Sequence, residues 1–190
     1  HLTTEQNQEI LTALLADNQR ATNIIQSLRS IFSDGKIGVE RIDITELVES
    51  VLKIAKPEIQ AKSLQVVLRL ESKSLIKANR GEIQQLLLNL INNAIQALSE
   101  STRSPRTLQI ESRDVLEGVQ LLVSDNGSGV PIDAQAHLFE LLSNSNKRSG
   151  MGLGLWLCHH IVSRHGGRIH YQDAPSGGAE FIVFLPSIQG

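Results

Sequence analysis

When segment 82–98 is wound into a helix, its apolar and polar residues separate onto two faces, and this pattern constrains the fold more than any other. Its leucines and isoleucines recur every three or four positions, as in a helix that buries one stripe against a sheet or another helix. The opposite face carries amides in place of the Lys and Glu that usually cover a solvated helix. The stripe consists of Ile83, Leu86, Leu87, Leu90, Ile91, Ala94 and Leu98, and the amide row of Gln85, Asn89, Asn92, Asn93 and Gln96.

The amide row has both a structural and a functional interpretation. Asn is a mediocre helix former, so the three asparagines between positions 89 and 93 lower the stability of the helix. An amide oxygen is a hard, neutral ligand that suits a magnesium ion already bridging phosphate oxygens. From this helix alone, a structural row and a ligand-binding row are equally open.

Periodicity along the rest of the 190-residue chain predicts an α+β fold. Helical and strand patterns are mixed, and neighbouring strands can form hairpins. This favours a mixed sheet with helices on one face, an α/β sandwich. Pro57 interrupts one predicted helix and is expected to shorten, kink or split it. The predicted helices are 5–32, one capped by Asp43 or Thr45 that runs to about Lys62, 82–98 with Asn79 as its cap, and 151–165; the predicted strands are 64–70, 107–113, 118–124, 168–171 and 179–185, with a short apolar step at Leu75–Ile76.

The helix predicted over 5–32 carries an apolar stripe that it cannot bury by itself. It ends at Asp34-Gly35, which is typical of a helix stop before a short linker. It therefore needs a partner, which can be another copy of the chain, a further helix or the domain that follows. Without that partner we expect it to self-associate or fold back, as large apolar patches do.

Composition excludes several classes of protein. The net charge is −2 and the pI is about 6.3, so no basic excess is present to attract a nucleic-acid backbone or an anionic membrane. Cys158 is the single cysteine, which excludes a disulfide framework and a cysteine-built zinc site. Aromatic residues make up only 3% of the chain, so the core must consist of Leu, Ile, Val and Ala. No apolar run is long enough to span a bilayer.

Two glycine motifs follow the amide-faced helix. Residues 125–129 read Asp-Asn-Gly-Ser-Gly and follow an apolar strand. They indicate either a simple strand-ending turn or a carboxylate at the sheet edge that accepts a hydrogen bond from a base amino group. Residues 150–155 read Gly-Met-Gly-Leu-Gly-Leu and open a predicted helix, where exposed backbone N–H groups favour an anion. The preceding polar loop and the spacing of its glycines argue against a dinucleotide-binding fingerprint.

Taken together and in this order, the three features resemble the N, G1 and G2 boxes of the Bergerat-type ATP-binding fold. This fold unites sensor histidine kinases, type II topoisomerases, Hsp90 and mismatch-repair ATPases. The resemblance covers residues 41–186, and 17–56 resembles the second helix of a histidine-kinase dimerisation domain with its linker. It looks most like the subgroup of the rhizobial oxygen-sensor and nitrogen-regulation kinases. We therefore expect an incomplete dimerisation domain over 1–40, contributing one long helix, and an ATP-binding catalytic domain over 41–190.

The resemblance implies a role for each matching residue. Asn93 would ligate Mg²⁺ between the phosphates, with Asn89 one turn earlier facing the same site. Asp125 would bind the adenine amino group, Gly127 and Gly129 would shape the adenine pocket, and a cation from Lys147 or Arg148 would reach the phosphates. The glycines that would close the lid over the phosphates are Gly150, Gly152 and Gly154.

Asn89 also bears on the type of reaction. Hydrolytic relatives carry a Glu at this position to activate water, and an amide cannot act as a general base. The resemblance thus implies phosphoryl transfer to a protein rather than hydrolysis, with Asn89 and Lys147 as catalytic residues. The lid departs from the subgroup pattern, because residues 141–146 lack the expected Pro and aromatics.

The function predicted from the sequence is the catalytic part of a two-component sensor histidine kinase. It would pass the γ-phosphoryl group of Mg·ATP to a histidine on a dimerisation helix, and from there to an Asp of a response-regulator receiver domain. By the resemblance, that histidine lies before residue 1, so we expect this chain to bind nucleotide without phosphorylating itself. The resemblance also implies a homodimer and a cytoplasmic location, with no direct membrane contact from this segment, in a parent protein that can be membrane-anchored. The alternatives are a degenerate, non-catalytic interaction module and a small ATPase or anti-sigma-type serine kinase.

Overall fold

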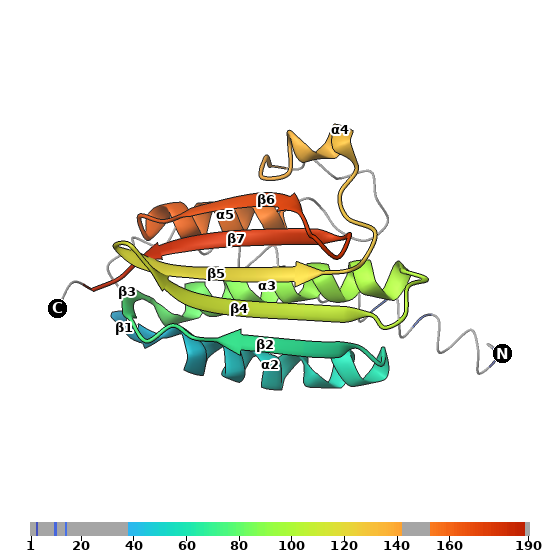
Figure 1. The fold of residues 1–190 in the computed structure, drawn as a ribbon, viewed down its shortest axis with the longest axis horizontal. Helices are drawn as coiled ribbons and strands as arrows, with labels where there is room; N and C mark the ends of the chain where they lie inside the picture. Colours follow the sequence, from blue (N-terminus) through green and yellow to red (C-terminus); the bar gives the residue numbers. More distant parts are fainter. Residues whose placement is uncertain (1–2, 4–9, 11–13, 15–37, 142–152, 189–190) are drawn as a thin grey trace.

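A five-stranded mixed sheet with three helices behind it forms the body of the protein (Figure 1). The computed structural model describes Thr3, Ile10, Leu14 and residues 38–141 and 153–188. The predicted α+β sandwich is confirmed, since α2, α3 and α5 all lie on one face of the sheet. The strands in sheet order are β2 (Gln65–Leu70), β4 (Thr107–Val115), β5 (Gly118–Asp125), β7 (Ala179–Pro186) and β6 (Arg168–Asp173), and the helices are α2 (Ile44–Ala61), α3 (Arg80–Glu100), α4 (Ile132–Gln135) and α5 (Gly154–Arg164).

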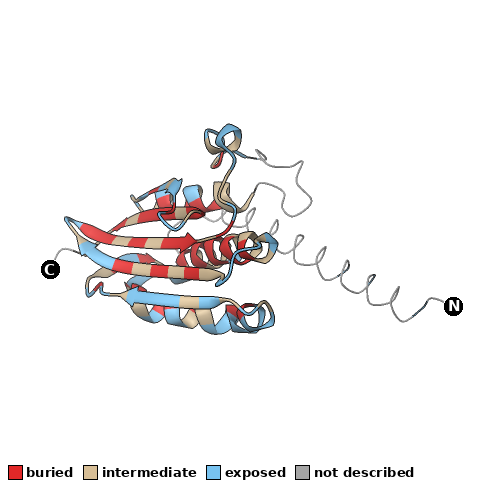
Figure 2. Cartoon of the chain, turned by 45° about the vertical axis from the view of Figure 1, so that its right-hand side comes forward, coloured by how far each residue is buried: buried red, intermediate tan, exposed pale blue. Residues whose placement is uncertain are grey.

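The two faces of the sheet differ in polarity, as the alternating burial along β4, β5 and β7 shows (Figure 2). β2 and β4 are parallel, and the other neighbours in this sheet are antiparallel. On the face away from the helices, polar side chains bond across strands, so this face is solvated. The pairs are Arg69–Glu111, Arg113–Gln120 and Gln172–Glu180.

The apolar stripe predicted on 82–98 forms the centre of the core. Leu86, Leu87, Leu90 and Ile91 have no exposed surface, and Ile95 adds to them. Through this stripe, α3 packs against the sheet and against both α2 and α5. Asn79 caps the helix as predicted, because its side chain accepts a hydrogen bond from the backbone N–H of Glu82 at 3.1 Å.

Pro57 does not divide the second helix. α2 continues through it to Ala61, and Asp43 provides the N-cap by accepting a hydrogen bond from the N–H of Thr45 at 2.8 Å. Proline removes the N–H that would bond to the carbonyl of Lys53. Both residues are exposed on the helix surface, where water can bond to that carbonyl.

Sequence periodicity missed a second, two-stranded sheet. β1 (Val39–Asp43) pairs antiparallel with β3 (Leu75–Asn79), with Ile42 opposite Ile76. Both isoleucines are fully buried, so this small sheet closes one end of the core. β1 crosses the predicted boundary between residues 40 and 41. The helix predicted over 5–32 lies outside the described residues except at Ile10 and Leu14, and the division into two domains stays a prediction.

Candidate functional site

Asp125 is a buried carboxylate at the end of β5, only 4% exposed. Its Oδ1 accepts hydrogen bonds from the backbone N–H of Gly127 at 2.8 Å and, more weakly, of Ala179 at 3.4 Å. Burial raises the pKa of Asp125, and these two hydrogen bonds offset part of that rise. Oδ2 accepts no hydrogen bond from the described residues, which leaves one carboxylate oxygen available to a ligand.

Glycines surround this carboxylate because there is no room for side chains. A Cβ on Gly178, just before β7, would lie 2.2 Å from the carbonyl oxygen of Asp125. A Cβ on Gly127 would lie 2.8 Å from Asp125 Oδ1 and 3.0 Å from the carbonyl of Ala97 on α3. Gly129 has a positive φ of 69°, a backbone conformation that residues with a side chain rarely adopt. Thus the turn at 125–129 brings its backbone against both α3 and the β6–β7 turn.

Asn126, in the middle of this motif, ties it to the chain that enters β4. Its Oδ1 accepts a hydrogen bond from the N–H of Thr107 at 2.8 Å, and its Nδ2 donates to the carbonyl of Pro105 at 2.8 Å. Both ends of the amide are therefore engaged by backbone. The sequence pattern included Asn126 without assigning it a role.

One face of α3 runs between the two glycine motifs. Asn89, Asn93 and Ala97 are spaced by four residues and so share a face, over a length of about 12 Å. Ala97 touches Gly127 at one end, and at the other end Asn89 Nδ2 donates to the carbonyl of Gly154 at 3.3 Å. The amide oxygen of Asn89 accepts from Gln85 at 2.9 Å. Between them, the half-buried side chain of Asn93 makes no hydrogen bond to the described residues.

α5 starts at Gly154, within the second glycine motif. Leu153 is its N-cap and supplies no side-chain hydrogen bond, so the first N–H groups of the helix have no capping side chain. A Cβ on Gly154 would meet none of the described residues within 4 Å, so their packing does not require glycine there. A helix N-terminus with free N–H groups favours an anion.

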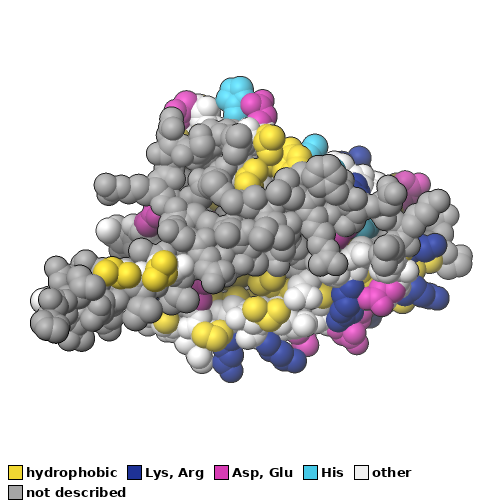
Figure 3. All heavy atoms as spheres, turned by 180° about the vertical axis from the view of Figure 1, so that it is seen from behind, with side chains coloured by type: hydrophobic (Ala, Val, Ile, Leu, Met, Phe, Trp, Pro, Cys, Tyr) yellow, Lys and Arg dark blue, Asp and Glu magenta, His cyan; other side chains and the backbone are white. Residues whose placement is uncertain are grey.

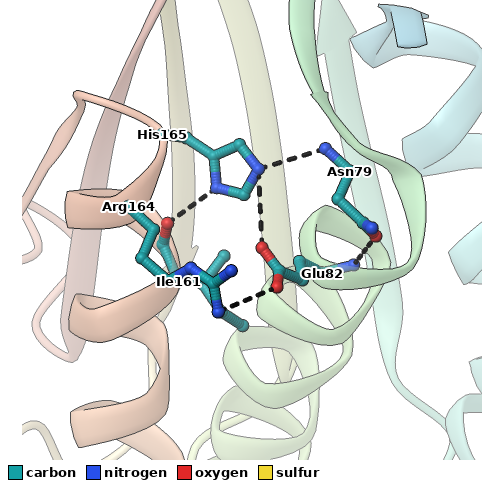
Figure 4. A network of polar contacts seen from close by, with 5 residues as sticks. All are labelled: Asn79, Glu82, Ile161, Arg164 and His165. Carbon is teal, nitrogen blue, oxygen red and sulfur yellow. Dashed lines mark hydrogen bonds and ion pairs between the residues drawn. The ribbon is translucent and has the colours of Figure 1, made fainter. Parts of the chain in front are cut away.

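A network of polar contacts fixes α5 against the start of α3 (Figure 4). His165 Nε2 accepts a hydrogen bond from the N–H of Asn79 at 3.1 Å, and its Nδ1 lies 2.8 Å from the carbonyl oxygen of Ile161. Glu82 pairs with Arg164 at 3.3 Å and lies 3.5 Å from His165 Nε2. With the contact between Asn89 and Gly154, both ends of α5 are held against the first half of α3.

The structure brings five of the predicted site residues together in two groups. Asp125, Gly127 and Gly129 meet at the end of β5, and Asn89 meets Gly154 between the helices. Asn93 lies on the face of α3 that joins these two groups. The remaining predicted residues, Lys147, Arg148, Gly150 and Gly152, lie outside the described residues.

The surface charge agrees with the composition. On the face seen in Figure 3, the described Lys and Arg side chains are interspersed with Asp and Glu. Within residues 38–141 and 153–188, no group of three or more His, Cys, Asp or Glu side chains is arranged to hold a metal ion. In that same part of the chain, no helix has the length and apolar composition required to cross a bilayer.

Comparison with protein families places the chain in a known family. Residues 78–189, more than half of the chain, match the family described as histidine kinase-, DNA gyrase B-, and HSP90-like ATPase. The chain belongs to this ATPase family. The matched segment of this histidine kinase-type ATPase domain contains α3, the motif that follows β5 and the start of α5, as the resemblance of these motifs predicted.

Curated relatives of the domain are sensor kinases. It is 32% identical over 170 residues to the sensor protein FixL of Bradyrhizobium diazoefficiens, covering 88% of this chain and 33% of FixL. It is 31% identical over 181 residues to the sensor histidine kinase TmoS of Ectopseudomonas mendocina, covering 94% of this chain and 18% of TmoS. The chain therefore spans a third or less of the length of these relatives.

Solved structures share the fold. The catalytic domain of histidine kinase ThkA superposes with a TM-score of 0.70 at 25% identity, covering 80% of this chain and 97% of that domain. Full-length ShkA, solved in complex with AMPPNP, superposes with a TM-score of 0.77 at 24% identity over 100% of this chain and 40% of ShkA. The fold is thus that of a histidine kinase catalytic domain.

Proposed function

We propose that this ATPase domain is the catalytic part of a two-component sensor histidine kinase. In this account its residues position Mg·ATP for transfer of the γ-phosphoryl group to a histidine on a dimerisation helix, and then to an aspartate of a response regulator. The observation that carries the proposal is the face of α3 between Ala97 and Asn89. This face runs for about 12 Å, with the buried carboxylate of Asp125 near its Ala97 end and the start of α5, whose N-cap residue adds no side-chain hydrogen bond, at its Asn89 end.

Asp125 suits the base end of a nucleotide. Its Oδ1 is already fixed by the backbone of Gly127 and Ala179, so the carboxylate is oriented before any ligand binds. Its free Oδ2 can accept a hydrogen bond from the adenine amino group. Since a carboxylate only accepts, it favours an amino group over a carbonyl at that position of the base.

Asn93 and the start of α5 suit the phosphate end. The amide oxygen of Asn93 is available to a magnesium ion, and the N–H groups at the start of α5 are available to phosphate oxygens. The ion, when bound, would neutralise phosphate charge as the γ-phosphoryl group leaves. We assign the same task to a cation from Lys147 or Arg148, and lid closure to Gly150, Gly152 and Gly154.

Asn89 supports transfer rather than hydrolysis. An amide has no basic form to deprotonate water, so we infer that the acceptor is a protein side chain. The hydrogen bonds of Asn89 to Gly154 and Gln85 also give it a positioning task, since they hold the start of α5 beside the α3 face. The histidine acceptor, the response-regulator partner, the homodimer formed through a dimerisation helix over 1–40 and the cytoplasmic location belong to the same proposal.

Calorimetric titration with a non-hydrolysable ATP analogue, with and without Mg²⁺, tests the proposal. We expect Asp125→Asn to weaken binding by about 10- to 100-fold, because an amide N–H₂ would face the adenine amino group where an acceptor is needed. We expect Asn93→Ala to remove the gain that Mg²⁺ gives. Asn92→Ala, which changes an exposed amide on the adjacent position, serves as the matched control and should bind as the wild type does.

The alternatives predict other results. If the wild type binds no nucleotide, the domain is a non-catalytic interaction module. If all variants bind equally, the nucleotide site lies elsewhere in the chain.

A further inference from the structure

We propose that Arg103 is a positioning residue that enforces selection for the adenine amino group. The inference rests on the proposed function and extends it to a residue outside the three sequence motifs. Arg103 lies in the connection between α3 and β4 and contacts the turn between β6 and β7.

The contact is a clamp on two successive carbonyl groups. Arg103 Nη1 donates to the carbonyl oxygen of Ser176 at 2.6 Å and to that of Gly177 at 2.7 Å. A Cβ on Gly177 would lie 2.7 Å from the same nitrogen, so the guanidinium packs directly on the turn. Charge-assisted hydrogen bonds of this kind are stronger than neutral ones. Arg103 therefore fixes the tip of the β6–β7 turn.

The next residues of that turn form one wall of the Asp125 site. Gly178 packs on the backbone and on Oδ1 of Asp125, and Ala179 donates the longer of the two hydrogen bonds to the carboxylate, at 3.4 Å. A hydrogen bond of this length is easily lost if its donor moves. The orientation of the carboxylate consequently depends on where the turn is held.

The backbone around Arg103 is also connected to the site by hydrogen bonds. Arg103 donates from its backbone N–H to Ser101 Oγ at 3.2 Å, and a few residues later Asn126 holds Pro105 and Thr107. The contacts thus form a closed ring. Asn126, next to Asp125 in the chain, bonds to the segment that contains Arg103, the Arg103 side chain bonds to the β6–β7 turn, and the residue after that turn bonds to Asp125.

This arrangement predicts an effect on base selection rather than on phosphate binding. A turn that is no longer clamped relaxes the position of the Asp125 carboxylate, which reads the base. The α3 face and the start of α5, which lie toward the phosphates, do not depend on Arg103. Loss of the Arg103 side chain should therefore change the difference in affinity between nucleotides whose base carries an amino group and those whose base carries a carbonyl.

The test compares ATP with ITP, in which a carbonyl replaces the amino group of the base and the neighbouring ring nitrogen N1 carries a proton. In the wild type we expect ATP to bind at least about tenfold more tightly than ITP. Arg103→Ala should reduce that preference about threefold or more by weakening ATP, while ITP binding stays within about twofold. Arg103→Lys should recover part of the preference, because an ammonium group also donates to carbonyls. Arg113→Ala is the matched control, since Arg113 is an exposed arginine that bonds to Gln120 on the solvated sheet face.

The possible outcomes separate the inference about Arg103 from the proposed function. If Arg103→Ala weakens ATP and ITP equally, or behaves as Arg113→Ala does, the inference is overturned while the proposed function stands. If the wild type binds neither nucleotide, the proposed function itself fails. Amide hydrogen exchange at Ala179 gives a readout without nucleotide, and unchanged exchange in Arg103→Ala would show that the clamp does not hold the turn.

Discussion

Gly178→Ala is the substitution whose effect can be worked out most directly from the structure. A Cβ on this residue would lie 2.2 Å from the carbonyl oxygen of Asp125 and 2.7 Å from both Asp125 Oδ1 and the backbone nitrogen of Gly127. These atoms are backbone or fixed by backbone, so the strain cannot be relieved by a rotamer change. Overpacking of this kind costs about 1–3 kcal/mol, which in a domain of this size lowers Tm by about 2–12 °C.

Binding should suffer beyond the loss of stability, because the atoms that must move belong to the carboxylate that we assign to the base. We expect weaker binding of ATP at a temperature where the variant is fully folded, measured by calorimetry alongside thermal unfolding. Gly118→Ala is the matched control, since a Cβ there would lie 2.4 Å from the carbonyl oxygen of Leu185, at the end of β5 opposite Asp125, and should lower stability without weakening ATP binding in the folded protein. A Gly178→Ala variant that unfolds at the wild-type temperature and binds ATP normally would refute this account of the Asp125 pocket.

Three further predictions concern titratable groups. Burial raises the pKa of Cys158 to about 12, so its thiol should resist alkylation in the native protein at pH 8 and react once the protein unfolds; rapid native labelling would contradict its burial. Burial also raises the pKa of Asp125, so its ionised form destabilises the fold at neutral pH. Asp125→Asn should therefore be the more stable protein at pH 7 in denaturant titrations, with the difference shrinking as the pH falls toward the ordinary carboxyl pKa, and a constant difference would argue against this reasoning. The pKa of Asp114 is shifted in the opposite direction, because the hydrogen bond from Ser72 lowers it, so the ionised form of Asp114 stabilises the fold. This stabilisation is present above the ordinary carboxyl pKa and is lost as the pH falls through the lowered value. Asp114→Asn should therefore lower the free energy of unfolding at pH 7, and by progressively less in acid. An unchanged free energy of unfolding at pH 7 would exclude a stabilising role.

The sequence was sufficient to predict elements whose side chains follow a clear period. The stripe on α3 and the alternation along β4 and β5 each identify a buried face, and helix packing on one side of a sheet follows from them. β1 was missed because its exposure does not alternate, with Val39, Glu40 and Arg41 all exposed. Its pairing with β3 is a long-range contact that local patterns do not encode.

The sequence suggests candidate site residues where the chemistry lies in a motif, and their roles stay a prediction. Asp125, Asn93 and Gly154 stand in short patterns whose residue types suggest a ligand. Arg103 and Gly178 could not be found in this way, since each acts through backbone atoms that only the fold brings close. A signal for the β6–β7 turn was present in the Gly-Gly pair at 177–178, but nothing in the sequence connects it with Asp125.

The measurement that tests the central claim most directly is NMR of the protein with an ATP analogue and Mn²⁺ in place of Mg²⁺. Paramagnetic broadening falls off steeply with distance from the ion. If the nucleotide lies along α3 as we propose, the Asn93 side-chain amide is broadened most strongly, and the backbone amides of Gly127 and Ala179 shift with nucleotide even in the absence of Mn²⁺. Broadening centred away from Asn93, or no shift at Gly127 and Ala179, would contradict the account.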